Sequence, residues 1–183
     1  MLFNAHKKTI DLLQHTVAQQ ASLLNAIERS MAVIEFDLQG TVLRANENFL
    51  KTLGYRAEQI EGQPHRLFCT PAYVRSAEYN QLWSDLRNGR FQSGTFERVG
   101  NAGQSVWLEA SYNPVRDDAG KVIKVVKYAM DVTPRLQAES EADAKLGAID
   151  RSMAVIEFNL DGTIITANDN FRSEERRVGK ECR

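Results

Sequence analysis

The chain opens with a long segment whose apolar residues recur at a helical spacing. Within residues 1–28, one row of side chains repeats every seven residues and is fully apolar, and a companion row is apolar at two of its four positions. The rows are Phe3, Ile10, Val17 and Leu24, and His6, Leu13, Gln20 and Ile27. Because no proline or glycine interrupts the run, the pattern predicts an amphipathic helix that pairs as a parallel coiled coil in a homodimer. Packing of this helix on its own domain is the alternative.

Shorter elements follow, with strand periodicity at both ends and helical periodicity between them. The strands are expected at 32–37, 41–44, 91–99, 105–115 and 121–132, and the helices from the cap Asn46 to Gly54, at 57–60 and at 72–88. Tight glycine turns join the last three strands, as antiparallel hairpins require. This order predicts an α+β domain, a five-stranded antiparallel sheet with the helices grouped on one side. Helices bunched over one face leave room for a pocket.

An internal repeat sets the domain boundaries. Residues 29–49 recur at 151–171 with 15 of 21 positions identical, at an offset of 122 residues. We therefore predict one complete unit and the opening of a second. The expected parts are an N-terminal coiled-coil helix 1–28, the domain 29–133, a helical linker 134–150, a truncated second repeat 151–171 and a tail 172–183. The tail lacks an apolar pattern, and we interpret it as foreign sequence appended to a truncated gene, with a native disordered tail as the alternative.

Composition narrows the function classes. The 183 residues carry a formal net charge of −1, so no basic field exists to hold a nucleic acid. No apolar run approaches the roughly 20 residues of a membrane helix, and the first residues lack a signal-peptide pattern. Cys69 and Cys182 cannot build a disulfide framework. A cytoplasmic protein that contacts neither nucleic acid nor membrane is expected.

Several short motifs in the first unit resemble those of a PAS domain. They are Ala45-Asn46 after the glycine turn, the LGY of residues 53–55 and the DVT of residues 131–133. The runs QPHRLFC and VWLEASYNPVRD are similar to those in the tandem PAS sensors of soluble bacterial methyl-accepting chemotaxis proteins. The resemblance implies the PAS fold and a sensory role. It also implies a coiled-coil output domain beyond this sequence, with a chemotaxis histidine kinase and a coupling protein as partners.

The resemblance also defines candidate pocket residues. They are Asn46, His65, Arg66, Phe68, Trp83 and Tyr112. His65 could hydrogen-bond a flavin or ligate haem iron, whereas a helix-capping or surface histidine is the simpler interpretation. Arg66 could pair with an anionic ligand group, although a solvent-facing arginine is the default. Trp83 lies on the apolar stripe of its helix, where it fills the core and could line the pocket.

Comparison with cofactor-binding PAS types leaves the cofactor open among FAD, haem and none. Light-sensing flavin domains carry a reactive cysteine where His65 stands, so that photochemistry is not expected. Kinase-type haem domains use a histidine on the long helix, and residues 72–88 contain none. The FAD domains of aerotaxis receptors share His65, Asn46 and Trp83, but Gln92 occupies the place of their usual tryptophan. An empty or small-ligand pocket is therefore preferred, with FAD next and haem last.

The end of the last strand is the candidate output site. Asp131, Val132 and Thr133 join strand to helix, where they form either a signalling hinge or a plain helix cap. Trp107 alternates onto the face opposite Val106 and is expected to contact a flanking helix or a partner. No nucleophile–base pair, metal-ligand cluster or phosphate-binding glycine loop is found, so an enzyme is not expected. The leading function is a sensory module, and the alternative is a ligand-free dimerisation and docking module.

Overall fold

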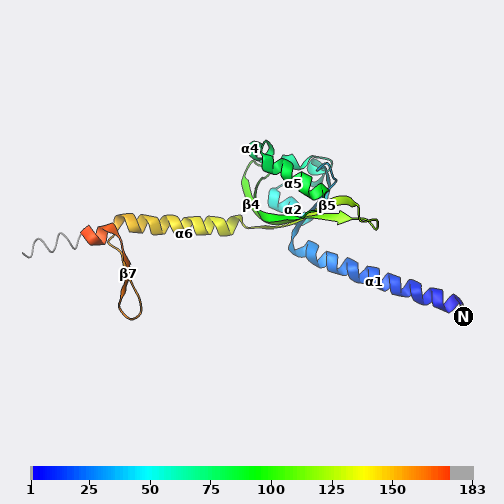
Figure 1. Cartoon of the computed structure of the whole chain (residues 1–183), viewed down its shortest axis with the longest axis horizontal. Helices are drawn as coiled ribbons and strands as arrows, with labels where there is room; N and C mark the ends of the chain where they lie inside the picture. Colours follow the sequence, from blue (N-terminus) through cyan, green and yellow to red (C-terminus); the bar gives the residue numbers. More distant parts are fainter. Residues whose placement is uncertain (1, 174–183) are drawn as a thin grey trace, which may run out of the picture. The chain divides into compact units, whose positions relative to one another are not determined.

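A computed structural model describes residues 2–173 (Figure 1). It divides into two units, Met1–Thr133 and Pro134–Arg183, and each is described by itself. The first unit contains α1 (Leu2–Ser30), β1 (Ala32–Phe36), β2 (Val42–Ala45), α2 (Glu47–Leu53), α3 (Ala57–Ile60), the 3₁₀ helix η1 (His65–Phe68), α4 (Pro71–Val74), α5 (Ala77–Arg87), β3 (Gln92–Val99), β4 (Ser105–Arg116) and β5 (Val122–Asp131). Helix α6 (Thr133–Ser152) begins at the boundary, and β6 (Ile156–Phe158) and β7 (Ile164–Ala167) follow it.

The first unit is built on one antiparallel sheet with the strand order β2-β1-β5-β4-β3. Helices α2 to α5 lie over one face of this sheet (Figure 1). The predicted α+β architecture is therefore confirmed, and the predicted strands agree with the observed ones to within about a residue at each end. In this layout the inner face of the sheet and the undersides of the helices form the core.

The core is closely packed around Trp83. Phe36 meets the Trp83 ring edge-on at a centroid distance of 5.7 Å, and Leu82 and Leu86 of the same helix are buried beside it. The β1–β2 turn packs on the indole at Gly40, where an added Cβ would lie 2.8 Å from the Trp83 ring. Gly40 also has a φ of 84°, so two constraints require glycine at this turn.

The expected continuous helix over 72–88 is instead two helices, α4 and α5. Ser76 interrupts it, because its hydroxyl accepts a hydrogen bond from the backbone N–H of Tyr79 at 3.3 Å and starts a new helix. Thr70 caps α4 in the same way through Tyr73 N–H, also at 3.3 Å. The segment between α3 and α4 contains η1. The helical period was right, and the capping role of Ser76 was missed.

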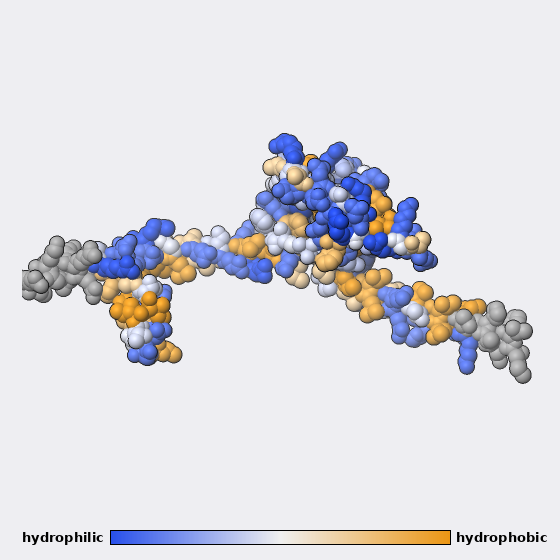
Figure 2. All heavy atoms as spheres, viewed as in Figure 1, coloured by the Kyte–Doolittle hydropathy of each residue, from blue (hydrophilic) through white to orange (hydrophobic). Residues whose placement is uncertain are grey.

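Helix α1 is confirmed over the predicted segment and extends to Ser30. Its apolar side chains Ile10, Leu12, Leu13, Val17, Leu23 and Leu24 are more than half exposed, and Figure 2 shows hydrophobic residues along the helix. Among residues 2–173, no helix is long and apolar enough to cross a membrane.

The second unit contains α6 and a β6–β7 hairpin with the register Ile156 to Ala167. Val155 and Ile156 are half-buried, while Phe158 is exposed. From residue 174 onward, the predicted tail and its Cys182 lie outside the described residues.

Candidate functional site

Five polar side chains meet inside the first unit, on the inner face of the sheet. We call them the interior polar cluster: His65, Cys69, Arg98, Tyr112 and Lys127, all buried. His65 comes from η1 and Cys69 follows it, while the other three come from β3, β4 and β5. Buried polar groups are costly unless they are hydrogen-bonded, so their partners define what this cluster can do.

Tyr112 is the centre of the cluster. Its Oη lies 3.1 Å from His65 Nε2 and accepts a hydrogen bond from Arg98 Nη2 at 2.9 Å. Burial raises the pKa of Tyr112 to about 12, against the lowering effect of Arg98, so the phenol keeps its proton at neutral pH. Because Arg98 can only donate, the phenol proton is directed to His65 Nε2. Neutral His65 then carries its own proton on Nδ1, which lies 3.7 Å from Cys69 Sγ.

The cluster carries positive charge that no carboxylate balances. Burial lowers the pKa of Lys127 well below its usual value, and nearby Arg98 lowers it further. Burial, Arg98 and Lys127 together lower the pKa of His65 in the same way. Among the described residues, no carboxylate forms an ion pair with Arg98 or Lys127. The two buried carboxylates have other partners: Glu35 pairs with Arg44 and Lys124, and Asp85 pairs with Arg90.

The residues around His65 decide whether haem or a flavin fits here. Its ring packs edge-on against Phe36, Trp83 and Tyr112 at centroid distances of 5.2, 5.4 and 5.7 Å, and stacks on Tyr79 at 5.7 Å. Nε2 is engaged by Tyr112 and Nδ1 faces Cys69. Four rings occupy the space that a porphyrin or an isoalloxazine would need. The residues in this arrangement fit neither group.

A groove opens to solvent beside the cluster, between α4–α5 and β3. It has a volume of about 500 Å³, and its lining includes Tyr73, Leu82, Asp85, Gln92 and Phe96. The Arg98 guanidinium lies over the Tyr73 ring at 5.2 Å and over the Phe96 ring at 5.0 Å. These two rings therefore line the groove and contact the interior polar cluster.

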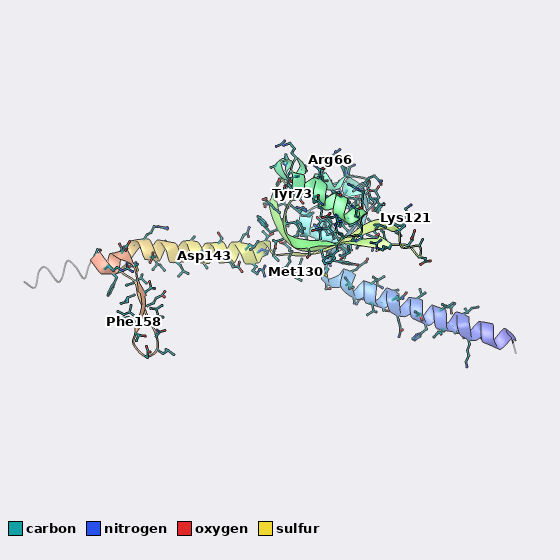
Figure 3. All side chains as sticks on the ribbon, viewed as in Figure 1. Arg66, Tyr73, Lys121, Met130, Asp143 and Phe158 are labelled. Atoms are coloured by element: carbon teal, nitrogen blue, oxygen red, sulfur yellow. The ribbon has the colours of Figure 1, made fainter. Side chains whose placement is uncertain are left out.

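The pocket residues predicted from the sequence do not all lie together. His65, Trp83 and Tyr112 come together in the interior, whereas Arg66 is exposed (Figure 3). Phe68 is buried but packs edge-on against Phe49 and Tyr55, at 5.3 and 5.6 Å.

Asn46 uses its whole side chain on the backbone. Its Oδ1 accepts from the N–H groups of Val33 and Phe49, both at 2.9 Å. Its Nδ2 donates to the carbonyls of Glu28 and Met31 at 2.9 and 2.8 Å. The predicted N-cap is therefore confirmed, and the same side chain also joins the end of α1 to β1. In the second unit, Asn168 makes the equivalent bonds to Val155, Phe171, Asp150 and Met153.

Sequence reasoning missed Arg98, Lys127 and Cys69 as members of the interior. A signal was present, because Lys127 alternates with Val125 and Ala129, so it falls on the apolar face of a predicted strand. Arg98 shares the face of Phe96 on β3 in the same way. A charge on the inner face of a sheet is a candidate for function, since lysine and arginine are rarely buried without a partner.

The end of the sheet is tied directly to the start of α6. Trp107 N–H donates to Thr133 Oγ1 at 2.8 Å, and Val132 N–H donates to the Trp107 carbonyl at 2.9 Å. Asp131 Oδ1 accepts from Thr133 N–H at 2.9 Å. The three candidate output residues thus connect β4, β5 and the first turn of α6. Trp107 itself is 37% exposed on the outer face.

Comparison with known proteins defines the class of this domain. Residues 42–129 match the sequence profile described as the PAS fold. A solved PAS domain from Colwellia psychrerythraea superposes with a TM-score of 0.56 at 21% identity, covering 65% of this chain and 98% of that one. An RNA-binding light-oxygen-voltage receptor superposes with a TM-score of 0.58 at 24% identity, covering 75% and 40%. The first unit therefore has the PAS fold.

Two bacterial proteins are similar to this chain in sequence. The biofilm dispersion protein BdlA of Pseudomonas aeruginosa is 51% identical over 146 residues, which are 80% of this chain and 35% of that protein. The aerotaxis receptor of Escherichia coli K12 is 29% identical over 79 residues, 43% of this chain and 15% of the receptor. The chain therefore spans about a third or less of either relative's length.

Proposed function

We propose that this chain is the sensing part of a cytoplasmic chemotaxis-type receptor. In this proposal the interior polar cluster detects a small ligand, and the junction Asp131–Thr133 passes the change through helices to an output domain beyond this sequence. The observation that carries the proposal is the buried, charged cluster beside an open groove. The names of the two relatives, a biofilm dispersion protein and an aerotaxis receptor, support a role in sensing and behaviour.

The composition of the cluster supports ligand detection. Replacing buried charged groups by apolar side chains of similar size is often neutral or stabilising, so folding alone does not explain Arg98 and Lys127 at this place. Buried ionisable groups with strongly shifted pKa values are enriched at functional sites. A ligand that engages them in one state of the domain and not in another would shift the balance between the two states.

The sheet offers a short route from the cluster to the junction. Tyr112 on β4 pairs with Lys127 on β5, and four residues further along, Leu108 pairs with Asp131. A change at the first pair can therefore move the second through the same two hydrogen-bonded strands. Trp107, next to Leu108, bonds directly to Thr133.

Helix α1 supports a homodimer. Ile10, Val17 and Leu24 repeat every seven residues and remain exposed in the single chain. A second copy of the helix would cover this row in a coiled coil. The resemblance to chemotaxis receptors further suggests a histidine kinase and a coupling protein as partners of the output domain.

A ligand-free docking module is the second candidate. The outer face of the sheet exposes Trp107 and Met130, and Met130 lies on the side away from helices α2 to α5 (Figure 3). An apolar face of this kind suits a protein partner.

Native mass spectrometry of the full chain, purified without denaturation, distinguishes the two functions. An absorbance spectrum before and after dithionite accompanies it and detects a flavin or haem. We expect a non-covalent small molecule bound to the chain, or stabilisation by compounds from a library of charged and neutral metabolites. If no molecule is bound and none stabilises the protein, the sensor proposal fails and the docking module replaces it.

A further inference from the structure

The electrostatics of the interior polar cluster identify the kind of ligand that would complete it. Arg98 and Lys127 are each 2% exposed, and both lie against Tyr112. A charge removed from water requires a counter-charge or dense hydrogen bonding, and the cluster provides neither for Lys127. Its Nζ lies 4.9 Å from the Tyr112 ring centroid, and no hydrogen-bond acceptor engages it among the described residues.

Arg98 also has donor capacity to spare. Its Nη1 donates to the Glu97 carbonyl at 2.6 Å and its Nη2 to Tyr112 Oη, but Nε is buried and has no partner within residues 2–173. An arginine fork binds carboxylate and phosphate oxygens in pairs, so a spare edge beside a second cation suits an anion. The indole Nε1 of Trp83 is a further buried donor without a hydrogen-bond partner in the described structure.

The side chains beside these donors on the sheet are small. A row of small residues crosses four strands of the inner face, next to the Tyr112–Lys127 pair. The register that defines the row pairs Ala32 with Ala129, Ala129 with Ala110, and Ala110 with Gly94. On the inner face, two cross-strand pairs lie between the backbone positions of Arg98 and Tyr112, namely this Gly94–Ala110 pair and Phe96–Leu108.

Two aromatic rings separate the cluster from a groove that is open to solvent. The lining of the groove beside α5 includes Tyr73 and Phe96, the two rings that contact the Arg98 guanidinium. Rotation of these rings would connect the groove with the cluster. At the groove, Asp85 is paired with Arg90, which offsets its repulsion of an entering anion, whereas Glu78 on the rim remains exposed.

We propose that the interior polar cluster binds a small anion through a carboxylate or phosphate group held between Arg98 and Lys127. This inference rests on the proposed sensory function and specifies the chemistry of its ligand. The anion supplies the missing counter-charge and accepts from the donors that the protein leaves free. Tyr112 is hydrogen-bonded to both His65 and Arg98, so binding of the anion would shift Tyr112 and with it β4.

Thermal unfolding of the full chain tests the inference, with acetate, succinate and inorganic phosphate titrated at constant ionic strength held with sodium chloride. We expect a saturable rise of several degrees in Tm with at least one of these anions, and none with succinamide, the neutral analogue of succinate. A response to acetate or succinate identifies a carboxylate ligand, and a response to phosphate alone identifies a phosphate ligand. No saturable response to any of them, or an equal response to succinamide, overturns the inference.

Variants locate the site. Lys127→Met and Arg98→Met should each weaken the anion response at least about tenfold, since each removes one charge-assisted contact. Lys124→Met, three residues earlier on β5 and engaged with Glu35, should keep it. An undiminished response in both cluster variants overturns the inference. If a flavin or a neutral metabolite is the bound molecule, the sensory function stands and only the anion assignment fails.

Discussion

Lys127 and Tyr112 face each other across β5 and β4, and the lysine Nζ lies 4.9 Å from the centre of the tyrosine ring. The contact between an ammonium group and a ring is worth about 0.5–2 kcal/mol, less than the cost of removing an unpaired charge from water. In the absence of a ligand, this pair is therefore a net burden on stability.

Replacing Lys127 by methionine should stabilise the ligand-free protein. The apolar chain fills similar space and removes an amine whose charged form is disfavoured by burial and by Arg98, so we expect the free energy of unfolding at pH 7 to rise by about 1–2 kcal/mol. Denaturant unfolding measures this change. Lys124→Met should bring no gain, because Lys124 forms an ion pair with Glu35 at 2.6 Å. A loss of stability in Lys127→Met would show that the ammonium is satisfied in the native protein.

Replacing Tyr112 by phenylalanine should destabilise the domain. The change removes one hydroxyl but leaves His65 Nε2 and Arg98 Nη2 buried without their shared partner. We expect a loss of about 1–3 kcal/mol in the free energy of unfolding, measured in denaturant. Tyr128→Phe, one strand away and half-buried on the outer face, is the control and should change stability by less than about 0.5 kcal/mol. Equal effects of the two substitutions would argue against the Tyr112 network.

Stability should fall in acid through His65. Its pKa in the folded protein is held well below the unfolded value of about 6.5, so between the two values the unfolded chain binds more protons. The free energy of unfolding therefore rises with pH in this window. As the pH drops below about 6.5, the stabilising contribution of neutral His65 decreases by up to about 1.4 kcal/mol per pH unit.

Unfolding measured from pH 7 to pH 5 tests this assignment. His65→Gln should flatten the acid slope, while His15→Gln, on exposed α1, should leave it unchanged. An unaltered slope in His65→Gln would mean that other groups cause the acid response.

Asn46 should be a stability residue as well as a cap. Alanine at this position leaves the backbone N–H groups of Val33 and Phe49 without their side-chain acceptor, whereas the carbonyls of Glu28 and Met31 keep a hydrogen bond from Asn48 Nδ2. We therefore expect a loss of about 2 kcal/mol in the first unit. Asn168→Ala removes the equivalent bonds of the second unit and should leave unfolding of the first unit unchanged. Thermal unfolding followed by tryptophan fluorescence separates the two, since Trp83 and Trp107 both lie in the first unit.

The sequence predicted the architecture well because its local signals agreed with the tertiary structure. The glycine turn at Gly40 and the alternation of Val106 and Leu108 marked hairpins and an inner face that the structure confirms. Ser76 was different, because one side-chain cap divides a helix without changing its apolar period.

The candidate site was predicted only in part. His65, Trp83 and Tyr112 were found from motif resemblance, and the structure brings them together. Arg98 and Lys127 were missed because charged residues in strands are usually exposed, although their alternation with apolar residues places both on the inner face. The hydrogen bonds from Asn46 Nδ2 to the carbonyls of Glu28 and Met31 could not be foreseen, since they depend on where α1 ends.

Hydrogen exchange of the full chain, with and without the anion that stabilises it, tests the central claim that the interior is coupled to the output junction. We predict altered protection at the interior residues of β4 and β5, and also at the amides of Trp107 and Thr133, with the β6–β7 hairpin unchanged as an internal control. Protection that changes only around the groove, with the two junction amides unaffected, would contradict a signal passing from the interior polar cluster to Asp131–Thr133.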